Sequence, residues 1–222
     1  MKKSFFIALS ILLISIPCFS AQQSKAAKSD SEIQKLIKDL KYGTADAKAN
    51  AAEALGKIGP AAKDAVSALS EALKDKEKDV RWRATYALGE IGPSAKAAVP
   101  ALIEALKDED ADVRGDAAYA LGNIGPVAIP ALIEALKDED ADVRGDAAYA
   151  LGNIGPAAKD AVPALIETLK DEDKYVRGDA ARALGNIGDK SALEALTYVA
   201  ENDSVKDVRN VAKKQLPKLN PE

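Results

Sequence analysis

The chain has 222 residues, of which 47% are hydrophobic and 30% are charged, so it carries enough apolar material to bury a sizeable core. Its formal net charge is −4, whereas a nucleic-acid-binding protein normally has a basic surplus gathered on one face. There is no His and a single Cys, which excludes zinc sites built on His or Cys, nucleophilic pairs that need a His, and His-ligated iron.

The first twenty residues have the three-part order of a secretory signal peptide. Two Lys precede an apolar run over residues 5–16, and small residues follow. A membrane anchor is the weaker interpretation, because this run is too short to cross a hydrocarbon layer of about 30 Å as a helix. A lipoprotein linked through Cys18 is a further alternative, although Ile16 and Pro17 stand where small residues would be expected. We therefore expect cleavage after Ser20 and a periplasmic or secreted protein that does not contact the membrane.

Cleavage would change the composition of the mature chain. Removing residues 1–20 takes two Lys, no acid and the only Cys, so the net charge becomes 29 − 35 = −6. A protein without a disulfide depends on packing for its stability. Residues 21–30 are small and polar with nothing to bury, and they predict a flexible tether.

From residue 31 onward the sequence repeats itself. Residues 100–126 recur without a change at 130–156. The segment Ala-Leu-Gly-x-Ile-Gly ends at intervals of 33, 33, 30 and 33 residues, and the 30-residue step lacks the small insert found at 94–96. A degenerate sixth copy runs over 191–216 and has the character of a terminal cap. The predicted units are about 31–64, 65–97, 98–127, 128–160, 161–190 and 191–222.

Each unit is predicted to form two helices. In the first helix one apolar stripe has i, i+3, i+4, i+7 spacing, and Pro100 stands in the first turn, where its missing N–H costs nothing. That stripe consists of Val99, Leu102, Ile103 and Leu106. In the second helix Val113, Ala117, Ala120, Leu121 and Ile124 share one side. Gly125 can take the left-handed conformation that ends a helix, and Pro126 prevents its continuation.

Stacking the units buries the second apolar flank of each helix pair. We therefore predict an all-α fold, an α-solenoid of about six stacked two-helix repeats in a right-handed superhelix. Asp-Val-Arg followed by Ala-Ala-x-Ala-Leu-Gly-x-Ile-Gly resembles the HEAT repeat, in the short subtype named after phycobilisome lyases, and the resemblance covers residues 31–216.

The resemblance implies that the Asp and Arg of this motif are framework residues that pair between neighbouring repeats. The matching positions are Asp79/Arg81, Asp112/Arg114, Asp142/Arg144 and Asp207/Arg209. The first unit has Ala47 and Lys48 instead, and Lys174 and Tyr175 precede the Arg of the fifth unit. We call this series of ion pairs between neighbouring units the ladder, and we expect it to be incomplete at those two places.

Members of the family divide among binding scaffolds, bilin lyases and a di-iron hydroxylase. The hydroxylase resemblance implies His and Glu ligands, which this chain cannot supply. Nothing in the sequence supports lyase chemistry, so we expect no enzyme and no cofactor. No carboxylate stands in an apolar context that would shift its pKa. Asp108-x-Asp110-x-Asp112 lacks the Gly and the bidentate Glu of an EF-hand loop, so helix capping is favoured over calcium binding.

Polar and aromatic residues recur on the second helices, about 100° away from the apolar stripe. Stacking would align them into a ribbon along the concave face. Tyr, Trp and Arg are enriched at interface hot spots, while the alternative is a solvated face that tolerates aromatic residues. Gly115, Gly145 and Gly178 beside the ribbon admit either a ligand backbone or close helix packing. The predicted binding residues are Trp82, Arg83, Tyr86, Asp116, Tyr119, Asn123, Asp146, Tyr149, Asn153, Tyr175, Asp179 and Arg182.

These observations favour a non-catalytic scaffold that binds a protein or peptide of basic or amide-rich character. The alternative function is a lyase-like accessory or chaperone of a cofactor-bearing protein. We expect no nucleic-acid partner, and a monomer or weak self-association.

Overall fold

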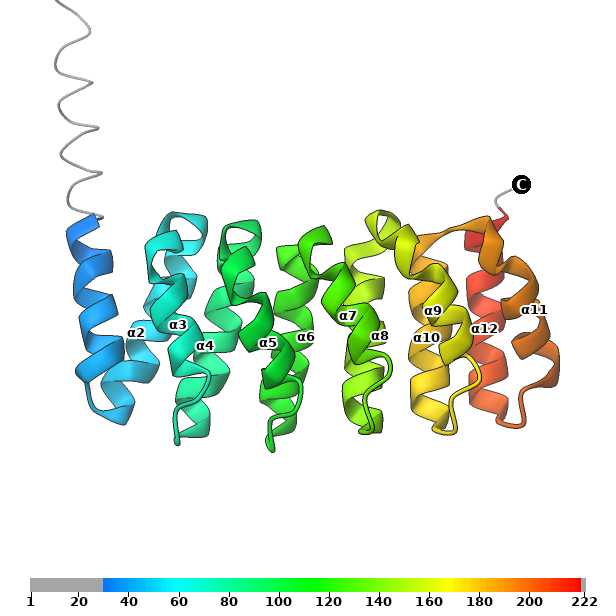
Figure 1. Cartoon of the computed structure of the whole chain (residues 1–222), viewed down its shortest axis with the longest axis horizontal. Coiled ribbons are helices and arrows are strands. Elements are labelled where there is room, and N and C mark those ends of the chain that lie inside the picture. The colour runs from blue at the N-terminus through cyan, green and yellow to red at the C-terminus, as the bar shows by residue number, and fades with distance from the viewer. Residues whose placement is uncertain (1–29, 221–222) are drawn as a thin grey trace, which may run out of the picture.

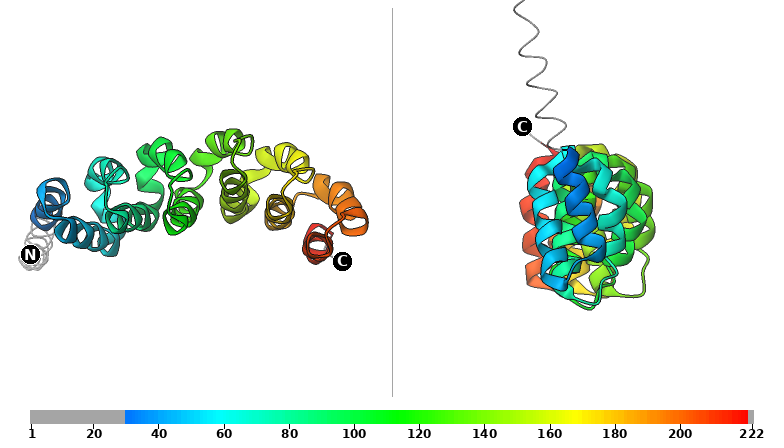
Figure 2. Two further views of the ribbon diagram at one scale, coloured as in Figure 1. Left: turned by 90° about the horizontal axis from the view of Figure 1, so that it is seen from below. Right: turned by 90° about the vertical axis from the view of Figure 1, so that its left-hand side faces the viewer.

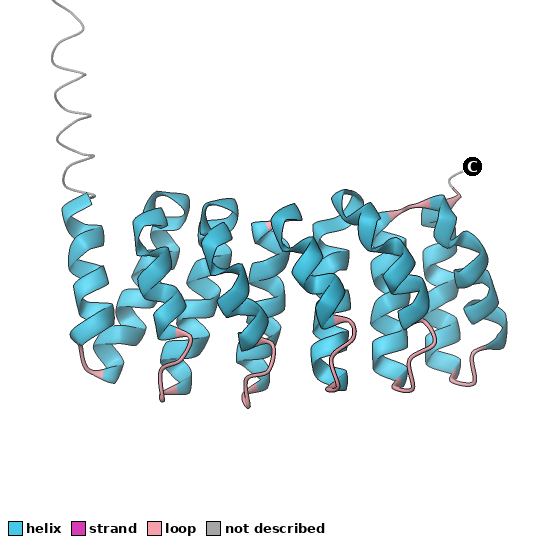
Figure 3. Ribbon diagram, viewed as in Figure 1, coloured by secondary structure: helices cyan, strands magenta, loops and turns pink. Residues whose placement is uncertain are grey.

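The computed structural model describes residues 30–220, and within them every regular element is a helix (Figure 3). The predicted signal peptide at 1–20 and residues 21–29 of the predicted tether lie outside the described residues. Asp30, the last residue assigned to the tether, is helical.

The helices come in pairs that stack along one axis (Figure 1). A helix at 30–42 pairs with α2 (Ala45–Ile58). The following pairs are α3 (Val66–Ala72) with α4 (Lys78–Ile91), α5 (Val99–Ala105) with α6 (Ala111–Ile124), α7 (Ile129–Ala135) with α8 (Ala141–Ile154), α9 (Val162–Thr168) with α10 (Lys174–Ile187), and α11 (Leu193–Asn202) with α12 (Lys206–Leu219). The predicted all-α solenoid of two-helix repeats is confirmed.

The stack is arched (Figure 2). The long helices α2, α4, α6, α8, α10 and α12, here called B helices, line the concave side, and each packs against the next. The first helices of the pairs, here called A helices, cover the convex side. The four inner B helices, α4, α6, α8 and α10, therefore have B-helix neighbours on both flanks and an A helix behind them, so their exposed side chains face the concave side.

The core is a continuous layer between the A and B helices. The Leu of the repeated motif is fully buried in successive B helices, at Leu88, Leu121 and Leu151, and Leu102 and Leu132 are fully buried on the A helices. All five residues of the apolar side predicted for the second helix are buried in α6. On the first helix, Ile103 is only partly buried.

Short 3₁₀ helices that the sequence did not predict lead into the A helices. They are η1 (Gly59–Ala65), η2 (Gly92–Ala98), η3 (Pro126–Ala128), η4 (Gly155–Ala161) and η5 (Lys190–Ala192). Gly125 ends α6 with φ 87° and ψ −149°, not in the left-handed helical region that was predicted. Among the five glycines that follow the described helices α2 to α10, Gly188 alone takes that conformation, with φ 72° and ψ 21°. The other connecting glycines must turn sharply into a 3₁₀ helix, and their backbone region is essentially restricted to Gly.

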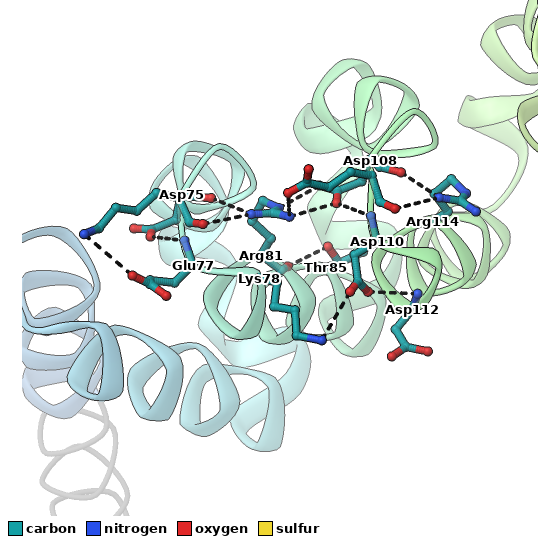
Figure 4. A network of polar contacts seen from close by, with 11 residues as sticks. Asp75, Glu77, Lys78, Arg81, Thr85, Asp108, Asp110, Asp112 and Arg114 are labelled. Atoms are coloured by element: carbon teal, nitrogen blue, oxygen red, sulfur yellow. Dashed lines mark hydrogen bonds and ion pairs between the residues drawn. The ribbon is translucent and has the colours of Figure 1, made fainter.

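Ion pairs at one end of the B helices join neighbouring units. Arg81 Nε and Nη2 donate to the two carboxylate oxygens of Asp108 at 2.7 and 3.0 Å, and Nη1 donates to the backbone O of Asp75 at 3.0 Å (Figure 4). Arg144 binds Asp171 in the same bidentate way, at 2.6 and 2.8 Å.

These ion pairs differ from the expected ladder in two ways. Arg81, Arg144 and Arg177 bind the first Asp of the next loop rather than the Asp of the motif, whereas Arg114 binds the motif residue Asp142 as expected. The ladder is also continuous where we expected gaps, since Lys48 Nζ donates to Asp75 at 2.7 Å and Arg177 Nε donates to Asp203 at 2.8 Å.

The step from α6 to α8 differs from the other steps between units. Its connection η3 has three residues, whereas the equivalent η2 and η4 have seven. Here Arg114 Nη2 donates to Asp142 at 2.9 Å, and the loop residue Asp138 forms its ion pair with Lys107 Nζ at 2.7 Å instead. A Cβ at Gly122 would meet Asn153 Cβ at 2.8 Å, three residues beyond the Ala that the equivalent glycines face. Both changes show that α8 is displaced by about one turn against α6.

Candidate functional site

All twelve predicted binding residues lie on four successive B helices, α4, α6, α8 and α10. Their aromatic side chains are exposed by 38% to 70%, in the increasing order Tyr119, Tyr86, Trp82, Tyr149 and Tyr175. Because the other faces of a B helix are covered, these rings lie on the concave side. The structure thus places the predicted aromatic residues along one face, and we call this set the aromatic ribbon.

The rings of the aromatic ribbon also contact the framework. A Cβ at Gly89 would lie 3.4 Å from Tyr119 Cδ1, and one at Gly56 would lie 3.7 Å from Tyr86 Cδ1. Each of these tyrosines therefore covers a glycine of the preceding unit and offers its remaining edge to solvent. The displaced α8 changes this contact, because the three atoms nearest to a Cβ at Gly122 belong to Asn153 and Ala150.

The predicted polar residues are held by neighbours. Arg83 pairs with Glu53 of the preceding unit, and its guanidinium lies 5.7 Å from the ring centroid of Trp82. Arg182 Nη1 donates to Asp179 at 2.5 Å within α10. Asn123 Nδ2 donates to the backbone O of Gly89 at 3.4 Å, so it contributes to packing between units.

Three aspartates of the concave face have raised pKa values. Burial raises the pKa of Asp146 to about 6, against the opposing effect of Arg114. Burial also raises the pKa of Asp179, opposed by Arg182, and that of Asp116, opposed by the Trp82 side chain. The expectation that no carboxylate is shifted was wrong, because neighbouring B helices cover residues that look fully polar along the chain.

Two hollows open on the concave face between B helices. The first, of about 260 Å³, lies across α6, α8 and α10, and we call it the α8/α10 hollow. It is lined by Ala111, Arg114, Gly115, Ala141, Asp142, Gly145, Asp146, Asp173, Tyr175, Val176 and Asp179. The second, of about 470 Å³, lies between α2 and α4 and includes Arg83. The sequence signal for the first hollow is its glycines, Gly115 and Gly145, which admit either a ligand backbone or close helix packing.

Sequence reasoning missed a larger, more apolar hollow of about 660 Å³ on the convex side, lined by residues of α9 and α11. The exposed Tyr198 belongs to this hollow. Its A-helix position has no counterpart in the aromatic ribbon, so the concave register could not indicate it.

The model for HEAT repeats matches residues 33–122, 93–152 and 129–216, which together cover most of the chain. The chain belongs to the HEAT-repeat family. No curated protein matches it in a sequence comparison.

Solved structures show what this HEAT-repeat protein is similar to. The complex of CpcE and CpcF of phycocyanin lyase from Nostoc sp. PCC7120 is 29% identical with a TM-score of 0.54, over 71% of this chain and 65% of that chain. An archaeal HEAT-like repeats protein from Thermococcus onnurineus NA1 has a TM-score of 0.60 at 15% identity, over 88% and 90% of the two chains. A computationally designed armadillo repeat protein for modular peptide recognition has a TM-score of 0.51 at 21% identity, over 84% and 99%. The last two show the fold alone.

Two further properties of the HEAT repeats concern metals and membranes. Within residues 30–220 no three or more Asp, Glu, His or Cys residues are grouped so that they could hold a metal ion. In the same part of the chain no single helix is long and apolar enough to cross a membrane. One pair bent by 116°, Ala111–Ile124 with Pro126–Ala135, passes that test of length and composition together.

Proposed function

We propose that this HEAT-repeat protein is a non-catalytic scaffold that holds a polypeptide on its concave face. The observation that carries the proposal is the aromatic ribbon, whose five rings come from four successive B helices and stay 38% to 70% exposed. Trp and Tyr dominate the energetics of protein interfaces, and a ligand that spans several units can contact several rings at once.

The charges beside the aromatic ribbon favour a basic partner. Asp116, Asp146 and Asp179 are partly buried there, and burial makes each of them harder to ionise. Lys, Arg or backbone N–H groups of a bound chain would add donors to these carboxylates, of which Asp179 already accepts a hydrogen bond from Arg182. A net charge of −4, or −6 after the expected cleavage, disfavours a nucleic acid.

A lyase-like accessory of a cofactor-bearing protein is the second candidate. It is favoured by the 29% identity to the phycocyanin lyase complex. A pigment that co-purifies with the protein, detected by its visible absorbance, would favour this candidate. A colourless protein that captures a polypeptide on the ribbon would favour the scaffold.

The proposed location of the scaffold is outside the cytoplasm, in the periplasm or secreted. The support is the order of charged, apolar and small residues in the first twenty positions. Intact mass spectrometry of the protein from its native host should give an N-terminus near Ala21. A chain that retains Lys2 and Lys3 would contradict export by cleavage.

The test of the scaffold uses the mature chain as bait in a periplasmic or secreted extract. The double variant Tyr119→Ala/Tyr149→Ala should weaken binding of the captured polypeptide by more than about 2 kcal/mol if both residues are hot spots. Tyr198→Ala is the matched control, since it removes an exposed Tyr from the convex side. Circular dichroism and urea unfolding establish that both variants are folded. If Tyr198→Ala lost binding while the double variant bound fully, the polypeptide would bind the A helices and not the aromatic ribbon.

A further inference from the structure

The repeats contain their own precedent for an occupant of the α8/α10 hollow. On the four B helices that carry the aromatic ribbon, the residue after the ladder Arg holds an equivalent position in the repeat. It is Gly in α6, α8 and α10, but it is Trp82 in α4, while Ala49 follows Lys48 in α2 and Asn210 follows Arg209 in α12. The second unit therefore has a planar ring at a position where the next three units have no side chain.

The Trp82 ring shows which contacts that place offers. The side chain is more than half buried, and it lowers the pKa of Asp116 on the next unit, against the burial that raises it. In α8 the equivalent of Trp82 is Gly145, and the equivalent of Asp116 is Asp179 on the next helix. A Cβ at Gly145 would lie 3.5 Å from Asp179 Oδ2. The hollow thus keeps a carboxylate at the place that Asp116 has beside Trp82, but no indole stands next to it.

The electrostatics distinguish this hollow from the place that Trp82 fills. Four aspartates line it against one arginine, which already binds Asp142. Asp173 is engaged in capping α10, and Arg182 binds Asp179 from one side. Asp146 has no ion-pair partner within 4.0 Å among the described residues. A positive charge in the hollow would therefore face a surplus of carboxylate.

At the rim stands Tyr175, whose side chain is 70% exposed. Lys174 Nζ lies 4.8 Å from its ring centroid, so this ring already accepts a cation on one face. A flat cation that enters the hollow could stack against the ring and place N–H donors toward Asp146 and Asp179.

Resting on the proposed scaffold function, the geometry points to a specificity site: the α8/α10 hollow receives the guanidinium group of an arginine in the bound polypeptide. The guanidinium is planar like the indole of Trp82, carries several N–H donors and is always charged. A Lys ammonium has the charge but not the planar fork, so it fits the precedent less well.

The inference can be tested without the natural partner. The probe is N-acetyl-arginine amide, titrated into the full mature chain while backbone amide shifts are followed by NMR. We expect a saturable shift at Gly115 and Gly145 and at least tenfold weaker binding of N-acetyl-citrulline amide, which has nearly the same shape and no charge. Equal binding of the two probes, or shifts confined to other parts of the chain, would overturn the inference.

Two matched variants sharpen the test. Gly145→Trp should place an indole in the hollow, as Trp82 does in the second unit, and abolish arginine binding. A Cβ at Gly145 makes only ordinary contacts, and at Gly178 no atom from outside its own helix backbone lies within 4 Å among the described residues, so both positions can accept a side chain. Gly178→Trp, one unit further along the same face, should leave binding unchanged. Retained binding in folded Gly145→Trp would contradict the inference.

The two proposals fail in different ways. If a captured polypeptide binds the wild type and Gly145→Trp equally, the arginine site is wrong and the scaffold stands. If the arginine probe binds as expected but Tyr119→Ala/Tyr149→Ala leaves polypeptide binding intact, the aromatic ribbon is wrong and the hollow stands.

Discussion

Residues 100–126 and 130–156 are identical in sequence and differ in structure. Arg144 of the second copy is buried and holds both oxygens of Asp171, whereas Arg114 of the first copy makes one bond to the exposed Asp142. The cause lies in the residues that follow each copy. The connection after the first copy is η3, with three residues, and the connection after the second is η4, with seven. A repeat therefore determines its own helices, while the connection determines how it meets the next unit.

The largest expected difference between the copies concerns the two arginines. Arg144→Ala should lower the free energy of unfolding by about 3 kcal/mol, because it leaves a largely buried Asp171 without its partner. Arg114→Ala should cost less than about 1 kcal/mol, since its partner carboxylate is exposed. Urea unfolding measures both. Arg144→Lys serves as a control and should lie between them, because Lys48 makes a single bond at the equivalent place. Equal costs for the two Ala variants would contradict the difference between the copies.

Giving the connection between α6 and α7 the length of η4 should remove the difference between the two copies. Replacing Val127 and Ala128 by the five residues of 157–161 adds three residues and imitates η4. We expect α8 to move back by one turn, Arg114 to bind Asp138 through both oxygens, and stability to rise by about 1 kcal/mol. Crystallography or NMR of the Arg114 side chain would show the new pair. If Arg114 stayed on Asp142, the connection length would not be what sets the register.

The smallest expected effect is a pH-dependent change in stability. It should differ between Asp116 and Asp146, which occupy the same place in the two copies. Burial raises the pKa of Asp146 to about 6, so the folded state favours its neutral form. The stabilisation from holding that proton is complete below pH 4 and disappears as the pH rises through 6. Asp146→Asn should therefore raise the free energy of unfolding by roughly 1 kcal/mol at pH 7.5, after allowance for solvent screening, and change it little at pH 4.

The control for this prediction is Asp116→Asn, since the Trp82 side chain lowers the pKa of Asp116 and so offsets part of the effect of burial. Its effect at pH 7.5 should be smaller. A gain for Asp146→Asn that is the same at both pH values would exclude ionisation of Asp146 as its cause.

Much of the fold could be predicted because its determinants are local. The spacing of Val113, Ala117 and Leu121 identified the buried side of a B helix, and the glycine after Ile124 identified its end. The aromatic positions were also predictable, since a residue that lies far from the apolar stripe on a helix must face solvent when the stripe is covered. The right-handed superhelix and the binding role of the ribbon stay predictions.

The order of two-helix units, the residues of their core and the side of α4, α6, α8 and α10 that bears the aromatic ribbon could all be derived from the residues along the chain. Periodicity, helix ends and burial follow from interactions within about one repeat. The packing of the helices was needed to show which Asp each Arg binds, that α8 is displaced by a turn, and that Asp146 lines a hollow where burial raises its pKa. These properties depend on the relative position of neighbouring helices, and two identical stretches of sequence can differ in them because three residues outside those stretches set that position.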